Sequence, residues 1–363
     1  RALTIGLCLI IATFTPMLGW GLELERDAED AQCTLNPSTP LCSQCSSQTA
    51  SSASAPLQSW IVVRPRGARA PTRVAILCVG FSDSVSQWIG VKFPNLRGQP
   101  SQVSRDPIKD NLFRTLDDGH TLVAMPVYAV TIPSIRALGR AIAQDIANGT
   151  LATHGNVCIF KGDRGHVEPL RDAATGGTEG LPDIRPTVLL GHSMGGFIAQ
   201  EIVLALPAPL QPQRIALVST GPSGVAGFPP VNPIAWGAMT HARVMADADF
   251  AALAQRLHYG DRVLSVEAMA HEGRASACWM ITTDTRDALY RLLRRRHLGK
   301  LEFGVFNGSD DTIIPPHQKQ WWAPVLSLPW RHAVRRLAPG QGHVSTLSDA
   351  ILLRFVGRTS QGS

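Results

Sequence analysis

The serine at position 193 has the surroundings that a nucleophile needs. It is the centre of a Gly-His-Ser-Met-Gly segment at 191–195. A short apolar run at 187–190 precedes it and a longer apolar segment at 196–206 follows, which predicts a buried strand, a tight turn and a helix in that order. A serine hydroxyl in such a turn stands above the sheet edge, next to a helix N-terminus that favours developing negative charge. We therefore expect Ser193 to attack an electrophilic substrate.

A serine nucleophile needs a base to accept its proton and a third group to orient that base. Two strand-like segments later in the chain each run into a turn that carries such a group. The first turn contains Asp310 and Asp311, and the second contains His343 ahead of a predicted helix. We expect His343 to act as the base, with His317 as its rival. Asp311 is the expected acid, and Asp310 is the alternative.

Three motifs resemble those of the α/β-hydrolase superfamily in its serine form, over the segment from about 74 to 356. They are GHSMGG at 191–196, GSDDTIIP at 308–315 and GHVSTLSDA at 342–350. The acid of this family usually stands three residues after a glycine, as Asp311 does after Gly308. The resemblance implies a catalytic triad of Ser193, Asp311 and His343, in the chain order of serine, acid and histidine.

The same resemblance identifies the segment at 74–81 as the first core strand and oxyanion loop. The backbone N–H groups of Phe81 and Met194 would then stabilise the oxyanion of the tetrahedral intermediate. The family usually has a histidine before the loop glycine, and this chain has Val79 there. Because the donor is a backbone group, valine leaves it in place but removes a side chain that commonly braces the loop.

Alternating strand and helix patterns predict an α/β fold with a mostly parallel, doubly wound sheet. Hydrophobic residues make up 44% of the chain and charged residues 17%, which suits a sheet buried on both faces. Strands are predicted at 60–64, 74–79, 121–127, 188–190, 214–219, 301–306 and 333–337, and helices at 108–116, 132–147, 196–206 and 345–356. The polar, glycine-rich segment at 151–185 is predicted to be an insertion loop. At about 225–300 the resemblance implies an inserted helical cap.

The residues before position 60 are predicted to lie outside the hydrolase domain, which extends over 60–363. Residues 2–22 carry no charge, so the segment at 1–22 is expected to be either a cleaved signal peptide or a signal anchor. The segment at 23–59 is rich in Ser, Thr, Pro, Gln and Ala without apolar periodicity, which indicates a linker. The protein is therefore expected to be secreted or membrane-anchored, and organellar targeting stays open.

No cofactor or metal is expected, because the sequence lacks histidine pairs and paired Cys-x-x-Cys motifs with metal-ligand spacing. The net charge is +6, but aromatic residues do not interleave with the basic run at 291–300, so no nucleic-acid partner is expected. We expect a monomer that binds a small, apolar ester and associates with a membrane, if at all, through residues 1–22. His192 is expected to point away from the site, and Cys78 to be a small buried hydrophobe.

These features predict a serine hydrolase, esterase-like or lipase-like, that cleaves a carboxylic ester through an acyl-enzyme. Aromatic and Met residues in the expected cap, among them Trp236, Met239 and Trp279, either favour an apolar acyl or alcohol group or simply pack the cap onto the core. Three alternatives stay open: an acyltransferase with the same triad, a small amide or peptide hydrolase, and a non-catalytic binding protein on a hydrolase fold. The intact order of serine, acid and histidine counts against the last of these.

Overall fold

The computed structural model of this chain describes the residues that build one α/β sheet and its covering helices. These residues are 57–65, 71–81, 83, 85–89, 107–129, 132, 134–149, 155–161, 166–169, 186–222, 272, 275, 276, 279, 285–295, 301–311, 314, 322 and 333–358. The expected signal segment at 1–22, almost all of the linker at 23–59 and most of the expected cap lie outside them. Within the described residues, no helix has both the length and the apolar character to cross a membrane.

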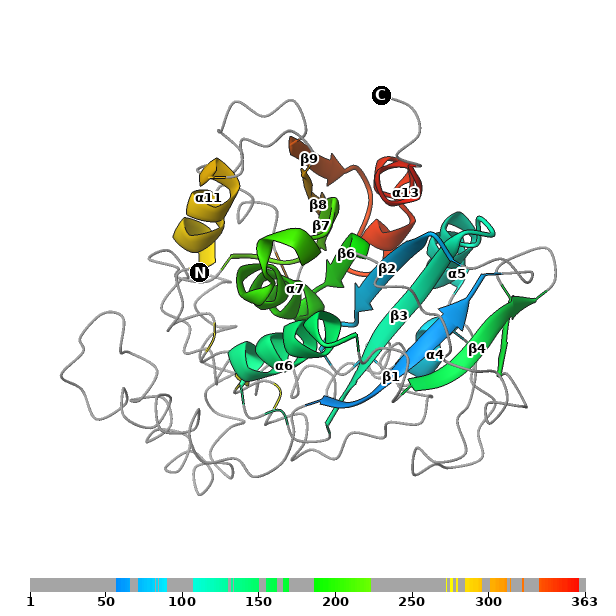
Figure 1. Cartoon of the computed structure of the whole chain (residues 1–363). Helices are drawn as coiled ribbons and strands as arrows, with labels where there is room; N and C mark the ends of the chain where they lie inside the picture. Colours follow the sequence, from blue (N-terminus) through cyan, green and yellow to red (C-terminus); the bar gives the residue numbers. More distant parts are fainter. Residues whose placement is uncertain are drawn as a thin grey trace, which may run out of the picture.

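The centre of the described structure is a nine-stranded sheet with the order β5-β4-β1-β3-β2-β6-β7-β8-β9 (Figure 1). Along this order, each pair from β3 to β9 is parallel, whereas β1 pairs antiparallel with β3 and β5 pairs antiparallel with β4. The mostly parallel α/β sheet that the sequence predicts is therefore confirmed. The strands are β1 (Leu57–Arg64), β2 (Arg73–Cys78), β3 (Thr121–Tyr128), β4 (Gly155–Lys161), β5 (His166–Pro169), β6 (Pro186–His192), β7 (Arg214–Val218), β8 (Glu302–Gly308) and β9 (Ala333–Ala338).

The helices form two groups that cover the two faces of the sheet (Figure 1). In the first group, α6 and α11 contact α7; in the second group, α4 and α13 contact α5. Helices on both faces explain why the central strands are apolar along their whole length instead of alternating with polar residues. The helices are α4 (Val85–Ile89), α5 (Pro107–Leu116), α6 (Ile135–Ala147), α7 (Met194–Ala205), α11 (Thr285–Arg295) and α13 (Ala350–Gly357), with short 3₁₀ turns η4 (Ala208–Leu210) and η6 (Ser345–Ser348).

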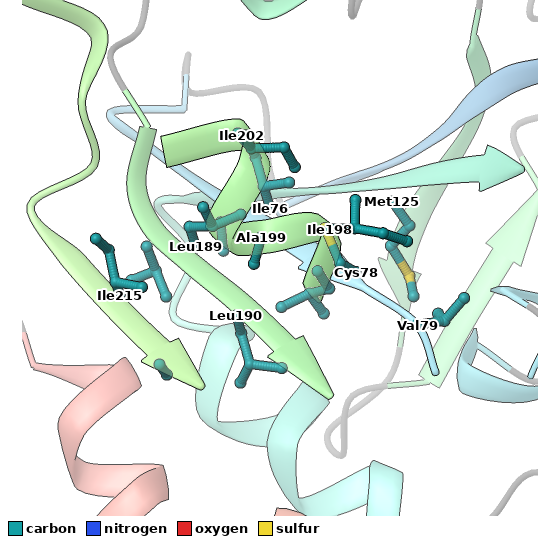
Figure 2. Packing of buried hydrophobic residues seen from close by; sticks show 14 of the residues in the cluster. Ile76, Cys78, Val79, Met125, Leu189, Leu190, Ile198, Ala199, Ile202 and Ile215 are labelled. Atoms are coloured by element: carbon teal, nitrogen blue, oxygen red, sulfur yellow. The ribbon is translucent and has the colours of Figure 1, made fainter. Parts of the chain in front are cut away.

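The core is packed around β6, the strand that leads to Ser193. Every residue of β6 is buried. Leu189 and Leu190 point to opposite faces of the sheet, and Ile198 and Ile202 of α7 pack above β6 and β2 (Figure 2). Because its two ends are fixed by this packing, the turn between β6 and α7 is attached to a buried part of the described structure.

Two predicted elements differ from the structure near the sheet edge and the chain end. The segment at 151–185, predicted as an insertion loop, contains β4 and β5, which extend the sheet beyond β1. The closing helix predicted at 345–356 is interrupted at Asp349, whose carboxylate accepts hydrogen bonds from the N–H groups of Ile351 and Leu352. Aspartate is a favoured helix N-cap, so it starts a new helix there instead of continuing the turn before it.

Two predicted boundaries also shift by a few residues. Strand β1 begins at Leu57, before the predicted domain boundary at 60. Helix α6 begins at Ile135 instead of 132, because the Ser134 hydroxyl accepts a hydrogen bond from the Ala137 N–H and caps the helix there.

Candidate active site

Ser193 lies between the end of β6 and the start of α7, as the strand–turn–helix pattern predicts. Its backbone has φ 55° and ψ −122°, a conformation that is unusual for a residue with a side chain. Hydrogen bonds hold it there: the Ser193 N–H donates to the Val218 carbonyl at 2.9 Å, and the Ser193 carbonyl accepts from the Gly196 N–H at 2.9 Å. Backbone strain of this kind is found where the surrounding structure fixes a functional side chain. Ser193 is partly exposed, whereas the residues on either side of it are buried.

The end of β2 packs closely against this turn and leaves no room for side chains between them. A Cβ atom at Gly195 would lie 2.1 Å from the Cys78 carbonyl oxygen, and one at Gly80 would lie 3.2 Å from the Ser193 Cβ. Gly80 is therefore directly beside Ser193. Phe81, the next residue, begins the turn that leaves the strand, and Met194 is the first residue of α7.

These placements are compatible with Phe81 and Met194 as oxyanion donors. As the first residue of a helix, Met194 has an N–H with no intrahelical acceptor, and the helix N-terminus favours negative charge. The loop before Phe81 is held from the far side, because the Tyr128 hydroxyl donates a hydrogen bond to the Val79 carbonyl at 3.2 Å. Both backbone N–H groups thus lie in segments that adjoin Ser193.

The structure brings His343 and Asp311 together from the turns after β9 and β8. The His343 Nδ1 atom lies 3.1 Å and 3.0 Å from the two carboxylate oxygens of Asp311. Asp311 is buried, and its Oδ1 also accepts a hydrogen bond from the Ile314 N–H at 2.8 Å. Asp310 is exposed and accepts from the Ser309 hydroxyl instead. A carboxylate that faces Nδ1 favours a proton on that nitrogen, which makes Nε2 the nitrogen able to accept one.

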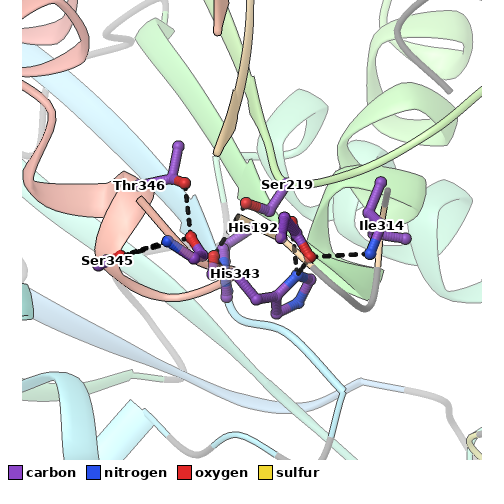
Figure 3. A network of polar contacts seen from close by, with 8 residues as sticks. His192, Ser219, Ile314, His343, Ser345 and Thr346 are labelled. Atoms are coloured by element: carbon purple, nitrogen blue, oxygen red, sulfur yellow. Dashed lines mark hydrogen bonds and ion pairs between the residues drawn. The ribbon is translucent and has the colours of Figure 1, made fainter. Parts of the chain in front are cut away.

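The turn that carries His343 is fixed by hydrogen bonds to its backbone (Figure 3). The His343 carbonyl accepts from the Ser219 hydroxyl at 2.9 Å and from the His192 Nε2 at 3.0 Å. The Gly342 carbonyl accepts from the Thr346 hydroxyl, and the Gly342 N–H donates to the Ser345 hydroxyl. The carboxyl ends of β6 and β7 therefore locate the histidine turn relative to Ser193.

The expectation that His192 points away from the site is wrong. Its ring lies 5.0 Å from the His343 ring and 6.4 Å from the Trp88 ring, and its Nε2 donates to the His343 carbonyl. Burial, and next the nearby His343, lower the pKa of His192 from 6.5 to about 3. His192 is thus a neutral hydrogen-bond donor near neutral pH.

The depressed pKa of His192 predicts a stability that falls with acidity. The unfolded chain binds a proton at this residue below about pH 6.5 and the folded chain only below about pH 3, so the unfolded state holds more protons in this window. The free energy of unfolding should therefore fall with decreasing pH by up to about 1.4 kcal/mol per pH unit from this residue. His343, Asp83 and Lys109 are the charged or titratable groups that act on it. Denaturant unfolding of the wild type and of His192→Gln between pH 4 and pH 7 measures how the free energy of unfolding changes with pH. Equal changes per pH unit in the two proteins would contradict this prediction.

The structure does not join all the expected site residues by hydrogen bonds. Among the described residues, Ser193 makes no side-chain hydrogen bond to His343, although its chain neighbour His192 contacts the His343 turn. Such bonds are often long in a free enzyme and shorten when substrate is bound. His317, the rival base, lies outside the described residues.

Sequence reasoning missed one buried polar cluster beside the turn that carries Phe81. Asp83 accepts hydrogen bonds from the Lys109 ammonium and from the Trp88 indole N–H. Lys109 was detectable in principle, since it shares the buried stripe of α5 with Leu112 and Phe113 at helical spacing. A lysine on an apolar stripe requires a buried partner.

The structure describes two further residues named in the sequence analysis, Cys78 and Trp279. Cys78 is fully buried, as expected, and burial raises the pKa of its thiol to about 12. Trp279, one of the cap residues expected to contact either substrate or core, is buried, stacks on Phe197 with ring centroids 4.5 Å apart and donates to Glu201. It therefore packs against the core. Within the described ranges, no group of three or more metal-ligating side chains comes together.

Asp311→Asn is expected to lower turnover by about 10⁴-fold, by analogy with other triads, because an amide favours the wrong histidine tautomer. Asp310→Asn is the matched control, since that carboxylate is exposed and bonded only to Ser309 in the described structure. It should retain most of the activity. Steady-state kinetics of the two variants side by side decide the assignment, and a severe loss confined to Asp310→Asn would move the acid by one residue.

Several solved structures are similar to this chain at low sequence identity. Solved structures similar to this chain include a thermophilic esterase from Thermogutta terrifontis, at 15% identity and a TM-score of 0.45, covering 80% of this chain and 87% of that one. A lipase-esterase related protein from Clostridium acetobutylicum has 11% identity and a TM-score of 0.47, with 84% and 97% covered. A hydrolase from Oleispira antarctica has 13% identity and a TM-score of 0.47, with 81% and 90% covered.

None of the curated protein sequences compared with this chain is significantly similar to it. A family model, however, matches most of its length. The match covers residues 75–353, from strand β2 to helix α13, and so includes Ser193, Asp311 and His343. The chain belongs to the alpha/beta hydrolase family.

Proposed function

We propose that this protein is a serine hydrolase that cleaves a carboxylic ester through an acyl-enzyme. The observation that carries the proposal is the contact of both Asp311 oxygens with the His343 Nδ1, in a turn hydrogen-bonded to the residue next to Ser193. Nucleophilic acyl transfer needs an oriented imidazole and a serine held in a fixed, partly exposed position.

In the proposed acylation step, the Ser193 hydroxyl oxygen forms a bond to the ester carbonyl carbon. His343 Nε2 accepts the hydroxyl proton, and the carboxylate of Asp311 stabilises the resulting imidazolium. The carbonyl oxygen becomes an oxyanion that accepts hydrogen bonds from the Phe81 and Met194 N–H groups. The carbon–oxygen bond of the ester then breaks, and the alcohol leaves with the proton from His343.

Deacylation repeats these steps with water. The water oxygen attacks the acyl carbon as His343 takes one of its protons, the bond to Ser193 breaks, and the proton returns to the serine. A carboxylic acid is released. Because the pKa of His192 is held at about 3, its side chain does not compete for a proton with His343 near neutral pH.

The substrate is proposed to have an apolar acyl or alcohol group. The experiment is a series of p-nitrophenyl esters from acetate to laurate, assayed with the wild type and with Ser193→Ala as the blank. Product analysis with and without an added acceptor alcohol separates hydrolysis from acyl transfer. Ester cleavage that requires Ser193 and yields free acid supports the proposal, whereas acyl transfer only, or cleavage only of amides, would replace it with one of the alternatives.

A further inference from the structure

The turn that carries Phe81 is built on a buried ion pair that the proposed chemistry does not use. The turn is closed by a hydrogen bond from the Asp83 N–H to the Gly80 carbonyl at 3.2 Å. Gly80 itself adjoins Ser193 and His192, because a Cβ atom there would lie 3.2 Å from the Ser193 Cβ and 3.2 Å from the His192 Nδ1. A shift of this turn would therefore move the Phe81 N–H relative to the nucleophile.

The Asp83 side chain anchors the other end of the turn. Its two oxygens accept from the Lys109 Nζ at 2.8 Å and 2.9 Å, and one of them also accepts from the Trp88 Nε1 at 2.5 Å. The Lys109 ammonium lies 5.1 Å from the centre of the Trp88 ring, a cation–π contact. Lys109 is 1% exposed and Asp83 is 8% exposed. Three separate elements, the turn, α4 and α5, thus meet at one carboxylate.

Stability alone does not explain a buried ion pair at this position. Removing two charges from water costs more than their attraction returns in many proteins, and an apolar pair of similar volume is often at least as stable. What a charged pair with three directed hydrogen bonds provides is a fixed geometry. The cluster also reaches the histidines, since the Trp88 ring lies 6.4 Å from the His192 ring.

We propose that Asp83, held by Lys109 and Trp88, is a positioning residue that fixes the Phe81 N–H in the oxyanion site. This inference rests on the proposed function. The oxyanion forms only along the reaction, so a misplaced donor should reduce kcat and leave KM nearly unchanged. A misplacement of about 1 Å costs on the order of 10²-fold in rate.

The test uses two double variants of the full chain in which both charges are removed together, so that neither remains buried without its partner. Asp83→Leu/Lys109→Met removes the ion pair and the acceptor for the Trp88 indole. Asp83→Asn/Lys109→Met removes the ion pair but keeps an amide oxygen that can accept from Trp88. The measurements are kcat, KM, the thermal unfolding midpoint and the inhibition constant of an alkyl trifluoromethyl ketone, which forms an oxyanion when serine adds to it.

The apolar variant, Asp83→Leu/Lys109→Met, is expected to lose about 30- to 100-fold in kcat, with KM within about threefold of the wild type. The inhibition constant of the trifluoromethyl ketone should rise by a similar factor, while the inhibition constant of the product carboxylate should not change. The asparagine variant should lose less kcat, about tenfold, because one hydrogen bond to the turn remains. Both variants should unfold near the wild-type temperature.

Arg214→Met is the matched control for loss of a buried charge. Arg214 lies at the start of β7, at the opposite end of the strands from Ser193, and donates to the Phe355 and Val356 carbonyls. This variant should unfold at a lower temperature and keep its kcat and its inhibition constant for the ketone.

A kcat within about threefold of the wild type in the apolar variant would overturn the inference, as would a loss of kcat without a weaker ketone affinity. If the apolar variant fails to fold, kcat and the ketone inhibition constant of the asparagine variant decide instead. Ser193→Ala, assayed in parallel, separates the two hypotheses. If it stays active, the proposed function fails; if it is inactive while the apolar variant keeps its kcat, only the role of Asp83 fails.

Discussion

Replacing Ser193 with alanine is expected to lower ester turnover by about 10⁴-fold or more. The hydroxyl oxygen is the atom that would bond to the substrate. Ser193 is the single residue between the end of β6 and the start of α7. The fold should survive, because the side chain is small and partly exposed, and the turn is held by backbone hydrogen bonds to Val218 and Gly196. Steady-state kinetics and thermal unfolding measure the two parts of this expectation.

Thr115→Ala serves as the control for loss of a hydroxyl group. The Thr115 hydroxyl donates to the Asn111 carbonyl on the surface of α5, and Thr115 lies next to Gly357 at the end of α13. This variant should keep wild-type kinetics. Wild-type turnover by Ser193→Ala, with the protein folded, would end the serine-hydrolase hypothesis.

His343→Gln is expected to remove nearly all activity, by on the order of 10⁴-fold in turnover, because glutamine cannot accept the serine proton and return it to the leaving group. Its amide can still donate a hydrogen bond to Asp311, so the turn should remain folded. The small remaining rate should lose the acid decline that a neutral-histidine base imposes. A pH–rate profile between pH 5 and pH 9 measures both effects.

His317→Gln is the partner experiment, since His317 follows the turn that carries Asp311 in the sequence. This variant should keep the rate and the pH profile of the wild type. The opposite pair of results, an active His343→Gln and an inactive His317→Gln, would mean that the contact between His343 and Asp311 is structural and that the base must be reassigned.

The positions of Ser193, Asp311 and His343 in the fold could be predicted from the sequence because the patterns around them are local. Ser193 and Asp311 each follow a buried apolar strand, and His343 follows the partly buried edge strand β9. Parallel strands bring their carboxyl ends to one edge of the sheet. The choice of Asp311 over Asp310 as the residue beside His343 came from spacing after Gly308, and the structure brings Asp311 to that ring. Local pattern and strand order are sufficient for these inferences.

The contacts that fix the site were not predictable in the same way, because they join residues distant in sequence. His192 donates to the His343 carbonyl across 151 positions, and Ser219 donates to the same atom across 124 positions. Lys109 meets Asp83 through the packing of α5 against α4. The sequence around Lys109 does not specify Asp83 as its partner, and the sequence around Asp83 does not specify Lys109.

The edge of the sheet was missed for a different reason. Strands β4 and β5 lie beyond β1, where β4 pairs with β1 on one side and with β5 on the other. A strand near an edge needs backbone partners more than a buried apolar face, so strand propensity is a poor guide there. The polar, glycine-rich composition at 151–185 accordingly predicted a loop where backbone pairing forms two strands.

The most direct test of the account is covalent labelling of the wild-type protein with an alkyl fluorophosphonate, followed by mass spectrometry of its peptides. The expected result is one adduct per chain, on the peptide that contains Ser193, with no adduct in Ser193→Ala and slow labelling in His343→Gln. Active enzyme that takes up no label, or an adduct on a different residue whose labelling abolishes turnover, would contradict the assignment of Ser193 as the nucleophile.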